Sequence, residues 1–133
     1  MLKYHIYEKQ DLTLFTAEGE VSLDEWRQTL LSYDKDGPTK YELYDLRELA
    51  NLFSVSDMFS LADLSTITTD TRPSNSKTAF LVSGRDHHGL SRIYDILVQA
   101  RAATWGTKAF FSLDEAERWL GIDLGEFREE LGV

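Results

Sequence analysis

The chain has 133 residues, no cysteine and a formal net charge of −9 at pH 7. Its length suits one domain with a single hydrophobic core, and a hydrophobic content of 42% excludes the disordered class. The absence of cysteine excludes disulfides, Fe–S clusters, cysteine zinc sites and thiol nucleophiles, while the negative charge argues against nucleic acid as a partner. No apolar run approaches the ~20 residues of a membrane span and no signal peptide pattern is present, so we expect a cytoplasmic protein without a membrane span.

The first third of the chain predicts a hairpin followed by a helix. Residues 4–7 and 12–17 are short β-prone runs, and the polar stretch between them has the length of a hairpin connection. Residues 22–25 read Ser-Leu-Asp-Glu, the pattern of a capping box at the start of a helix. Residues 36–38, Asp-Gly-Pro, predict the end of that helix.

The middle of the chain predicts a third strand, a second helix and a fourth strand. Residues 41–46 have strand character, and Ser54 and Ser56 offer N-caps for a helix. The residues that we expect this helix to direct inward are Val55, Met58, Phe59 and Ala62. Residues 68–76 form the longest predicted loop, which we expect to be mobile. Residues 77–82 are almost continuously apolar, as in a central strand covered on both faces.

The last third of the chain predicts two more helices and a fifth strand. Residues 83–89 turn into a helix whose apolar stripe runs over residues 90–98, and residues 107–111 supply the strand. Residues 112–115 repeat Ser-Leu-Asp-Glu and predict a second capping box. The expected order is ββαβαβαβα, an α/β fold in which residues 1–133 make one domain around a single mixed five-stranded sheet. After the hairpin, right-handed crossovers can place the strands parallel.

This order is accompanied by three motifs: Tyr-Asp-Leu-Arg at residues 44–47, His-Gly-Leu-Ser-Arg at residues 88–92, and Phe-Ser-Leu-Asp-Glu-Ala-Glu-Arg-Trp-Leu at residues 111–120. Together they resemble the SpoIIAA-like family of small bacterial STAS-type domains over nearly the whole chain. That family is related in fold to anti-sigma factor antagonists and, more loosely, to the CRAL-TRIO lipid carriers. The resemblance implies a binding or regulatory module without an established reaction.

The resemblance also implies a position for a phosphorylation switch. Antagonist STAS domains carry a phosphorylatable Ser, usually preceded by Asp, at the start of the helix after the third strand, and Ser54 and Ser56 lie near that position. Here Phe53 precedes Ser54 and Val55 precedes Ser56, so the family pattern is not matched. Helix capping is the alternative explanation for both serines.

Candidate binding residues gather where the predicted parallel strands end, because ligands of open α/β sheets bind outside those carboxyl ends. The candidates there and at the adjoining helix starts are Asp45, Arg47, Ser54, Ser56, Gly84, Arg85, His88 and Arg92. The amino end of the third helix, with Arg85 and Arg92 nearby, could hold an anion. For Asp45 and Arg47, pairing with neighbouring groups is the structural alternative.

The sequence offers no catalytic motif. Neither a Gly-x-Ser-x-Gly elbow nor a His-Glu-x-x-His helix is present. The side chains of His87 and His88 diverge on any regular element, which disfavours a shared metal ion. We therefore expect a protein that is not an enzyme and uses no metal or other cofactor.

Two functional hypotheses follow. The first is a non-catalytic regulatory or scaffolding domain that binds another protein through the second helix and the adjoining strand end, with self-association as a homodimer as a further possibility. The second is a carrier of a small apolar or anionic ligand such as a lipid. In the carrier, Val55, Met58, Phe59 and Leu61 would line an apolar cavity, and Arg85, His88 and Arg92 would meet an anionic head group.

Overall fold

The computed structural model describes residues 1–50, 54–84 and 105–133. Its strands form one five-stranded sheet in the order β1-β2-β3-β4-β5. The strands are β1 (Leu2–Tyr7), β2 (Leu12–Gly19), β3 (Tyr41–Leu49), β4 (Lys77–Leu81) and β5 (Gly106–Phe110). β1 is antiparallel to β2, and the remaining neighbours are parallel. The predicted α/β class and mixed five-stranded sheet are confirmed.

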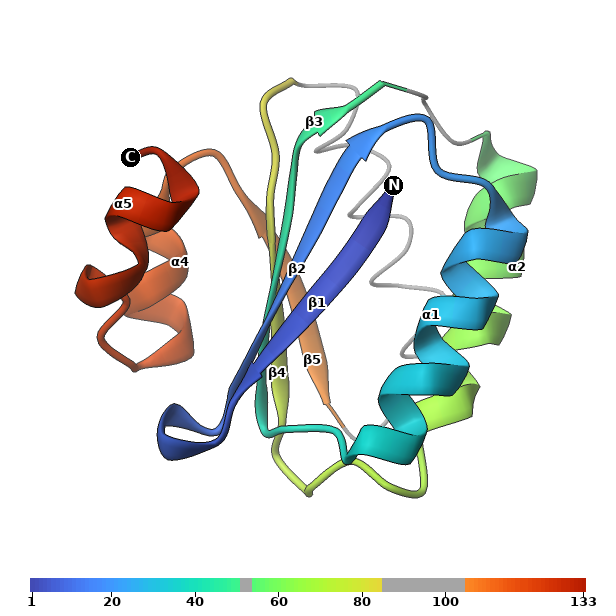
Figure 1. The fold of residues 1–133 in the computed structure, drawn as a ribbon, viewed down its shortest axis with the longest axis horizontal. Helices are drawn as coiled ribbons and strands as arrows, with labels where there is room; N and C mark the ends of the chain where they lie inside the picture. The colour runs from blue at the N-terminus through green and yellow to red at the C-terminus, as the bar shows by residue number, and fades with distance from the viewer. Residues whose placement is uncertain (51–53, 85–104) are drawn as a thin grey trace.

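Helices cover both faces of this sheet (Figure 1). α1 (Leu23–Asp36) and α2 (Val55–Leu64) lie side by side on one face, and α4 (Leu113–Leu120) and α5 (Arg128–Leu131) lie on the other. Short 3-10 turns are η1 (Glu8–Gln10), η2 (Ser65–Thr68) and η3 (Gly125–Phe127). The predicted third helix falls on residues 85–104 and lies outside the described residues.

The two faces of the sheet carry different cores, because successive side chains of a strand point to opposite faces. The core beneath α1 and α2 is rich in aromatic rings: Phe15, Trp26, Tyr33, Tyr44 and Phe80. Within it, the rings of Phe15 and Tyr44 on neighbouring strands stack with centroids 4.0 Å apart. The other core is largely aliphatic and includes Leu12, Leu14, Leu43, Leu81, Leu113, Leu120, Leu124, Phe127 and Leu131. The C-terminal residues therefore complete the second core.

The helices begin at the predicted serines, but their caps differ from the predicted ones. Ser22 accepts a hydrogen bond from the Glu25 amide at 3.1 Å, while the Glu25 carboxylate accepts one from the Leu2 amide of β1 instead of returning to the cap. Ser112 accepts from the Glu115 amide at 3.2 Å and donates to the Glu115 carboxylate. The reciprocal capping box forms at Ser54, where the sequence did not predict one.

The carboxyl ends of β2, β3 and β4 share one edge of the sheet because these strands are parallel. Figure 1 shows the start of α2 and the C-terminus at this same end of the molecule. Most of the candidate binding residues in the described part of the chain lie there.

Candidate functional site

The end of β3 carries an ion pair between Asp45 and Arg47. The Arg47 guanidinium donates from Nε to Asp45 Oδ1 at 2.9 Å and from Nη2 to Asp45 Oδ2 at 3.0 Å. Asp45 is buried and Arg47 is partly buried. The hydrogen bonds that Arg47 donates to Asp45 raise the pKa of Arg47, which favours the charged guanidinium. These two candidate residues therefore pair with each other.

A β-bulge places Arg47 in this position. Thr16 of β2 pairs with Asp45, and the next paired residue of β2, Glu18, is opposite Glu48. Ala17 therefore faces two residues of β3, Leu46 and Arg47, as in a bulge that bends the longer strand and redirects a side chain. The Arg47 amide donates to Asp45 Oδ1 at 3.2 Å, so it bonds to a side chain of its own strand.

Arg47 also connects three segments of the chain. Its Nη2 donates to the carbonyl of Leu131, the last residue of α5, where a helical carbonyl has no partner within the helix. Its own carbonyl accepts a hydrogen bond at 3.3 Å from Ser83, just after β4. The sequence marked Arg47 as a candidate, but it carried no signal for the contact with Leu131, because 84 residues separate the two.

The start of α2 is fixed by its capping box. Ser54 Oγ accepts from the Asp57 amide at 3.1 Å, and the Ser54 amide donates to Asp57 Oδ2 at 3.0 Å. The predicted capping role of Ser54 is confirmed. Ser56 lies in the first turn and is exposed, and it does not cap the helix.

Two apolar side chains of α2 face outward. Val55 and Phe59 are 52% and 47% exposed, whereas Met58 and Ala62 are buried. The prediction that Val55 and Phe59 point inward is wrong, because the buried stripe of this helix runs through Met58, Leu61 and Ala62. Val55 and Phe59 are four positions apart and so share one face of α2.

The remaining candidates are close in sequence to the predicted third helix. Gly84 follows Ser83 at the carboxyl end of β4 and is partly buried. Arg85, His88 and Arg92 lie outside the described residues, and so does the anion site predicted for them.

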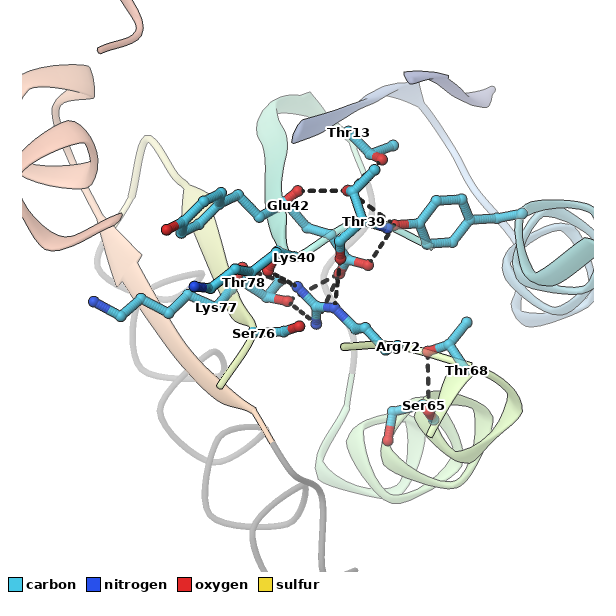
Figure 2. A network of polar contacts seen from close by, with 12 residues as sticks. Thr13, Thr39, Lys40, Glu42, Ser65, Thr68, Arg72, Ser76, Lys77 and Thr78 are labelled. Atoms are coloured by element: carbon cyan, nitrogen blue, oxygen red, sulfur yellow. Dashed lines mark hydrogen bonds and ion pairs between the residues drawn. The ribbon is translucent and has the colours of Figure 1, made fainter. Parts of the chain in front are cut away.

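A second polar cluster lies at the opposite edge of the sheet and was not predicted (Figure 2). Its centre is Arg72, in the segment before β4, whose side chain is 0% exposed. The guanidinium forms an ion pair with Glu42 of β3, with Nη1 and Oε1 3.2 Å apart. It also donates from Nη1 to Thr78 Oγ1 at 2.6 Å.

The other donors of Arg72 bond to backbone carbonyls. Nε donates to the carbonyl of Thr39 at 3.2 Å, and Nη2 donates to those of Lys40 and Lys77 at 3.1 and 2.9 Å. The ring of Trp105 lies 4.9 Å from the guanidinium carbon. These contacts contradict the prediction of a mobile loop over residues 68–76, since its central side chain is buried and hydrogen-bonded.

The carboxylate of Glu42 also accepts hydrogen bonds from two hydroxyl groups. Tyr33 Oη of α1 donates to Oε2 at 2.8 Å, and Thr78 Oγ1 donates to Oε1 at 2.9 Å. Burial, and next the charge of Glu42, raise the pKa of Tyr33 well above its ordinary value. This cluster joins α1, β3 and the segment before β4. Because the charges of Arg72 and Glu42 are buried and paired with each other, neither is available to a ligand.

In residues 1–50, 54–84 and 105–133, no helix is both long and apolar enough to cross a membrane. In the same part of the chain, no three side chains of His, Cys, Asp or Glu converge as metal ligands.

The sheet order, the single antiparallel edge strand and the helices on both faces define an α/β fold of the SpoIIAA-like STAS type, as the resemblance predicted. Among solved structures, this fold is found in an anti-sigma factor antagonist from Mycobacterium paratuberculosis. The match covers 91% of this chain and 95% of that chain, with a TM-score of 0.54 and 14% sequence identity. No family model and no curated protein matches the chain. At this identity, the structural likeness establishes the fold alone.

Proposed function

We propose that this chain is a non-catalytic regulatory or scaffolding domain, with residues 1–133 acting as one cytoplasmic unit that binds a protein partner. The proposed contact surface is the α2 surface, formed by Ser54, Val55, Ser56 and Phe59. The observation that carries the proposal is the outward position of Val55 and Phe59 on one helical face.

A partner that covers this face of α2 would remove both side chains from water. Burying a fully exposed Val or Phe side chain is worth about 1.5–3 kcal/mol, and about half of this remains to be gained here because Val55 and Phe59 are 52% and 47% exposed. Aromatic residues also dominate the energetics of many protein interfaces. Ser54 and Ser56 are exposed beside the pair and could form a polar rim. An apolar pair with a polar rim is the arrangement that suits a protein partner.

The structural comparison supports the same class of function. The similar protein is an anti-sigma factor antagonist, a description that makes another protein its target. The carrier hypothesis lacks comparable support. Met58 and Leu61 belong to the packed core beneath α2, and Val55 and Phe59 point away from it.

The test is capture of partners by the tagged protein and by two variants, followed by mass spectrometry. Phe59→Ala should lose a captured protein that the wild type retains. Phe111→Ala is the matched control, because Phe111 is 50% exposed but lies just after β5, and it should retain that protein. Equal capture by the wild type and Phe59→Ala would contradict the proposed surface.

Self-association is measured separately by light scattering. If the partner is a second copy of this chain, the wild type should be a dimer and Phe59→Ala a monomer. A monomeric wild type that captures no protein would contradict the proposed function as a whole. Native mass spectrometry of the same sample detects any copurified lipid, which would favour the carrier instead.

A further inference from the structure

β1 forms one edge of the sheet, and every second residue of this strand directs its backbone groups away from β2. The Met1 carbonyl accepts a hydrogen bond from the Glu18 amide at 2.9 Å, which makes these two residues a hydrogen-bonded pair. Bonded and outward-pointing residues alternate along an antiparallel strand, so Leu2, Tyr4 and Ile6 point their N–H and C=O groups outward. In the part of the chain that the structure describes, no strand lies on that side of β1 (Figure 1).

This edge lacks two of the features that commonly stop an edge strand from pairing with another chain. Its register with β2 is unbroken from Leu2 to Tyr7, so no bulge twists it away, and it contains no proline. The Leu2 amide is covered, because it donates to the Glu25 carboxylate of α1. The outward groups of Tyr4 and Ile6 have no partner among the described residues. These two residues are therefore open to pairing.

A second copy of β1 supplies the matching groups when the two strands run antiparallel with His5 opposite His5. Tyr4 of each copy then lies opposite Ile6 of the other, and the two residues can exchange both backbone hydrogen bonds. The Leu2 amide keeps its bond to Glu25. The side chains of Tyr4 and Ile6 pack partly buried against the first core, so the pairing covers their remaining exposed surface.

The charges on the other face of β1 favour the same register. Lys3, His5 and Tyr7 share that face because side chains alternate along a strand, and the Tyr7 ring packs on Phe127 of the second core. In this register Lys3 of one copy lies opposite Tyr7 of the other, whose Oη donates to Glu130 at 2.8 Å. Lys3 and Glu130 are both exposed and can pair across the interface. A shift of two residues would place Lys3 opposite His5 and lose this ion pair.

We propose that two copies of this chain pair through β1, antiparallel about His5, so that one continuous sheet crosses a homodimer. The contact uses neither Val55 nor Phe59, so it goes beyond the proposed function and does not depend on it. A single short strand makes a small interface, and the dissociation constant should lie roughly in the micromolar to millimolar range.

Single cysteines test the register, because the chain contains none of its own. In His5→Cys, the two cysteines face each other with Cα atoms about 4.5 Å apart, a separation that a disulfide can bridge. In Lys3→Cys, the matched control, the two cysteines lie about 14 Å apart along the strands, too far for a disulfide. Both positions are exposed, so reactions on random collision should be similar. With oxidised glutathione as the oxidant, the disulfide dimer should form at least about tenfold faster in His5→Cys. Equal rates would overturn the proposal.

Sedimentation velocity tests the ion pair by exchanging its charges. Lys3→Glu should weaken the dimer by about tenfold, because it places like charges opposite each other twice in the dimer. Combining Lys3→Glu with Glu130→Lys should restore the wild-type affinity, and circular dichroism checks that each variant is folded. Failure of the double variant to recover would overturn the proposed register.

The same measurement separates this interface from the α2 surface. Phe59→Ala should dimerise like the wild type, whether or not it captures another protein. Loss of the dimer in Phe59→Ala would place self-association on the α2 surface and overturn the proposal. A wild type that stays monomeric up to about 1 mM would overturn it as well, and partner capture through α2 would be unaffected by that result.

Discussion

Arg72 and Glu42 form a buried ion pair that joins the segment before β4 to the start of β3, with Nη1 and Oε1 3.2 Å apart. Each partner has further hydrogen bonds, so both charges are satisfied within the fold. Removing one partner of such a pair leaves the other buried and uncompensated.

Arg72→Leu should lower the free energy of unfolding by about 3–5 kcal/mol, because Glu42 loses its counter-charge inside the protein. Urea denaturation measures this change. Arg128→Gln serves as the control, since its ion pair with Asp114 is on the surface and should contribute little. Similar stabilities for Arg72→Leu and the wild type would contradict the assignment of Arg72 as the centre of the cluster.

Tyr33 should make the protein sensitive to alkali. Burial and the neighbouring Glu42 raise the pKa of Tyr33 in the folded state, so the folded state favours the protonated phenol. The associated stability is fully present below the unfolded pKa of about 10 and is lost as pH rises above it.

Tyr33→Phe should reduce this loss above pH 10. At neutral pH it should cost about 1–3 kcal/mol, because Glu42 and the Thr39 amide lose a partner. Denaturation curves across pH 7–12 measure both effects. Tyr7, whose pKa is raised to about 12 by burial and by Glu130, should leave a residual decline in the variant. An unchanged pH dependence in Tyr33→Phe would contradict the prediction.

Met58→Ala should mainly lower stability, whereas Phe59→Ala should mainly lower partner binding. Met58 is buried in the core beneath α2, so its truncation should cost about 2–5 kcal/mol. Phe59 is about half exposed, and its truncation should cost much less while removing partner capture. Thermal unfolding of the two variants separates these effects. A large loss of stability in Phe59→Ala would identify it as a core residue, as the sequence predicted.

Ser54→Ala should lower stability by about 0.5–2 kcal/mol, because it removes the side chain that accepts from the Asp57 amide. Ser56→Ala should leave stability nearly unchanged, since Ser56 is exposed and is not the N-cap. Chemical denaturation of both variants provides the comparison. Equal losses would contradict the assignment of Ser54 as the cap.

Phe127→Ala should destabilise the fold by about 3–5 kcal/mol, although the residue lies near the C-terminus. Phe127 is buried, and its ring packs on that of Tyr7 of β1 with centroids 4.6 Å apart. Val133→Ala is the control, because Val133 is half exposed and should tolerate truncation. A stable Phe127→Ala variant would show that the C-terminal segment is dispensable for the second core.

The amino-acid sequence determined the features that depend on neighbouring residues. Apolar runs and their spacing predicted the five strands. The serines before residues 23, 55 and 113 predicted three helix starts, because an N-cap needs only a side chain within reach of the next turn. The ordered motifs also predicted the SpoIIAA-like fold.

Only the tertiary structure decided the features that join distant residues. The segment around Arg72 is polar and contains Pro73, so its sequence resembles a mobile loop. It is ordered by Glu42, 30 positions earlier, and by the strand that follows. In the same way, apolar residues occupy several faces of α2, so the sequence alone does not show which face is buried. Packing against α1 and the sheet buries Met58 and leaves Phe59 about half exposed. Sequence periodicity gives the spacing of apolar side chains, but the neighbours present in space determine which of them are buried and which charges are paired.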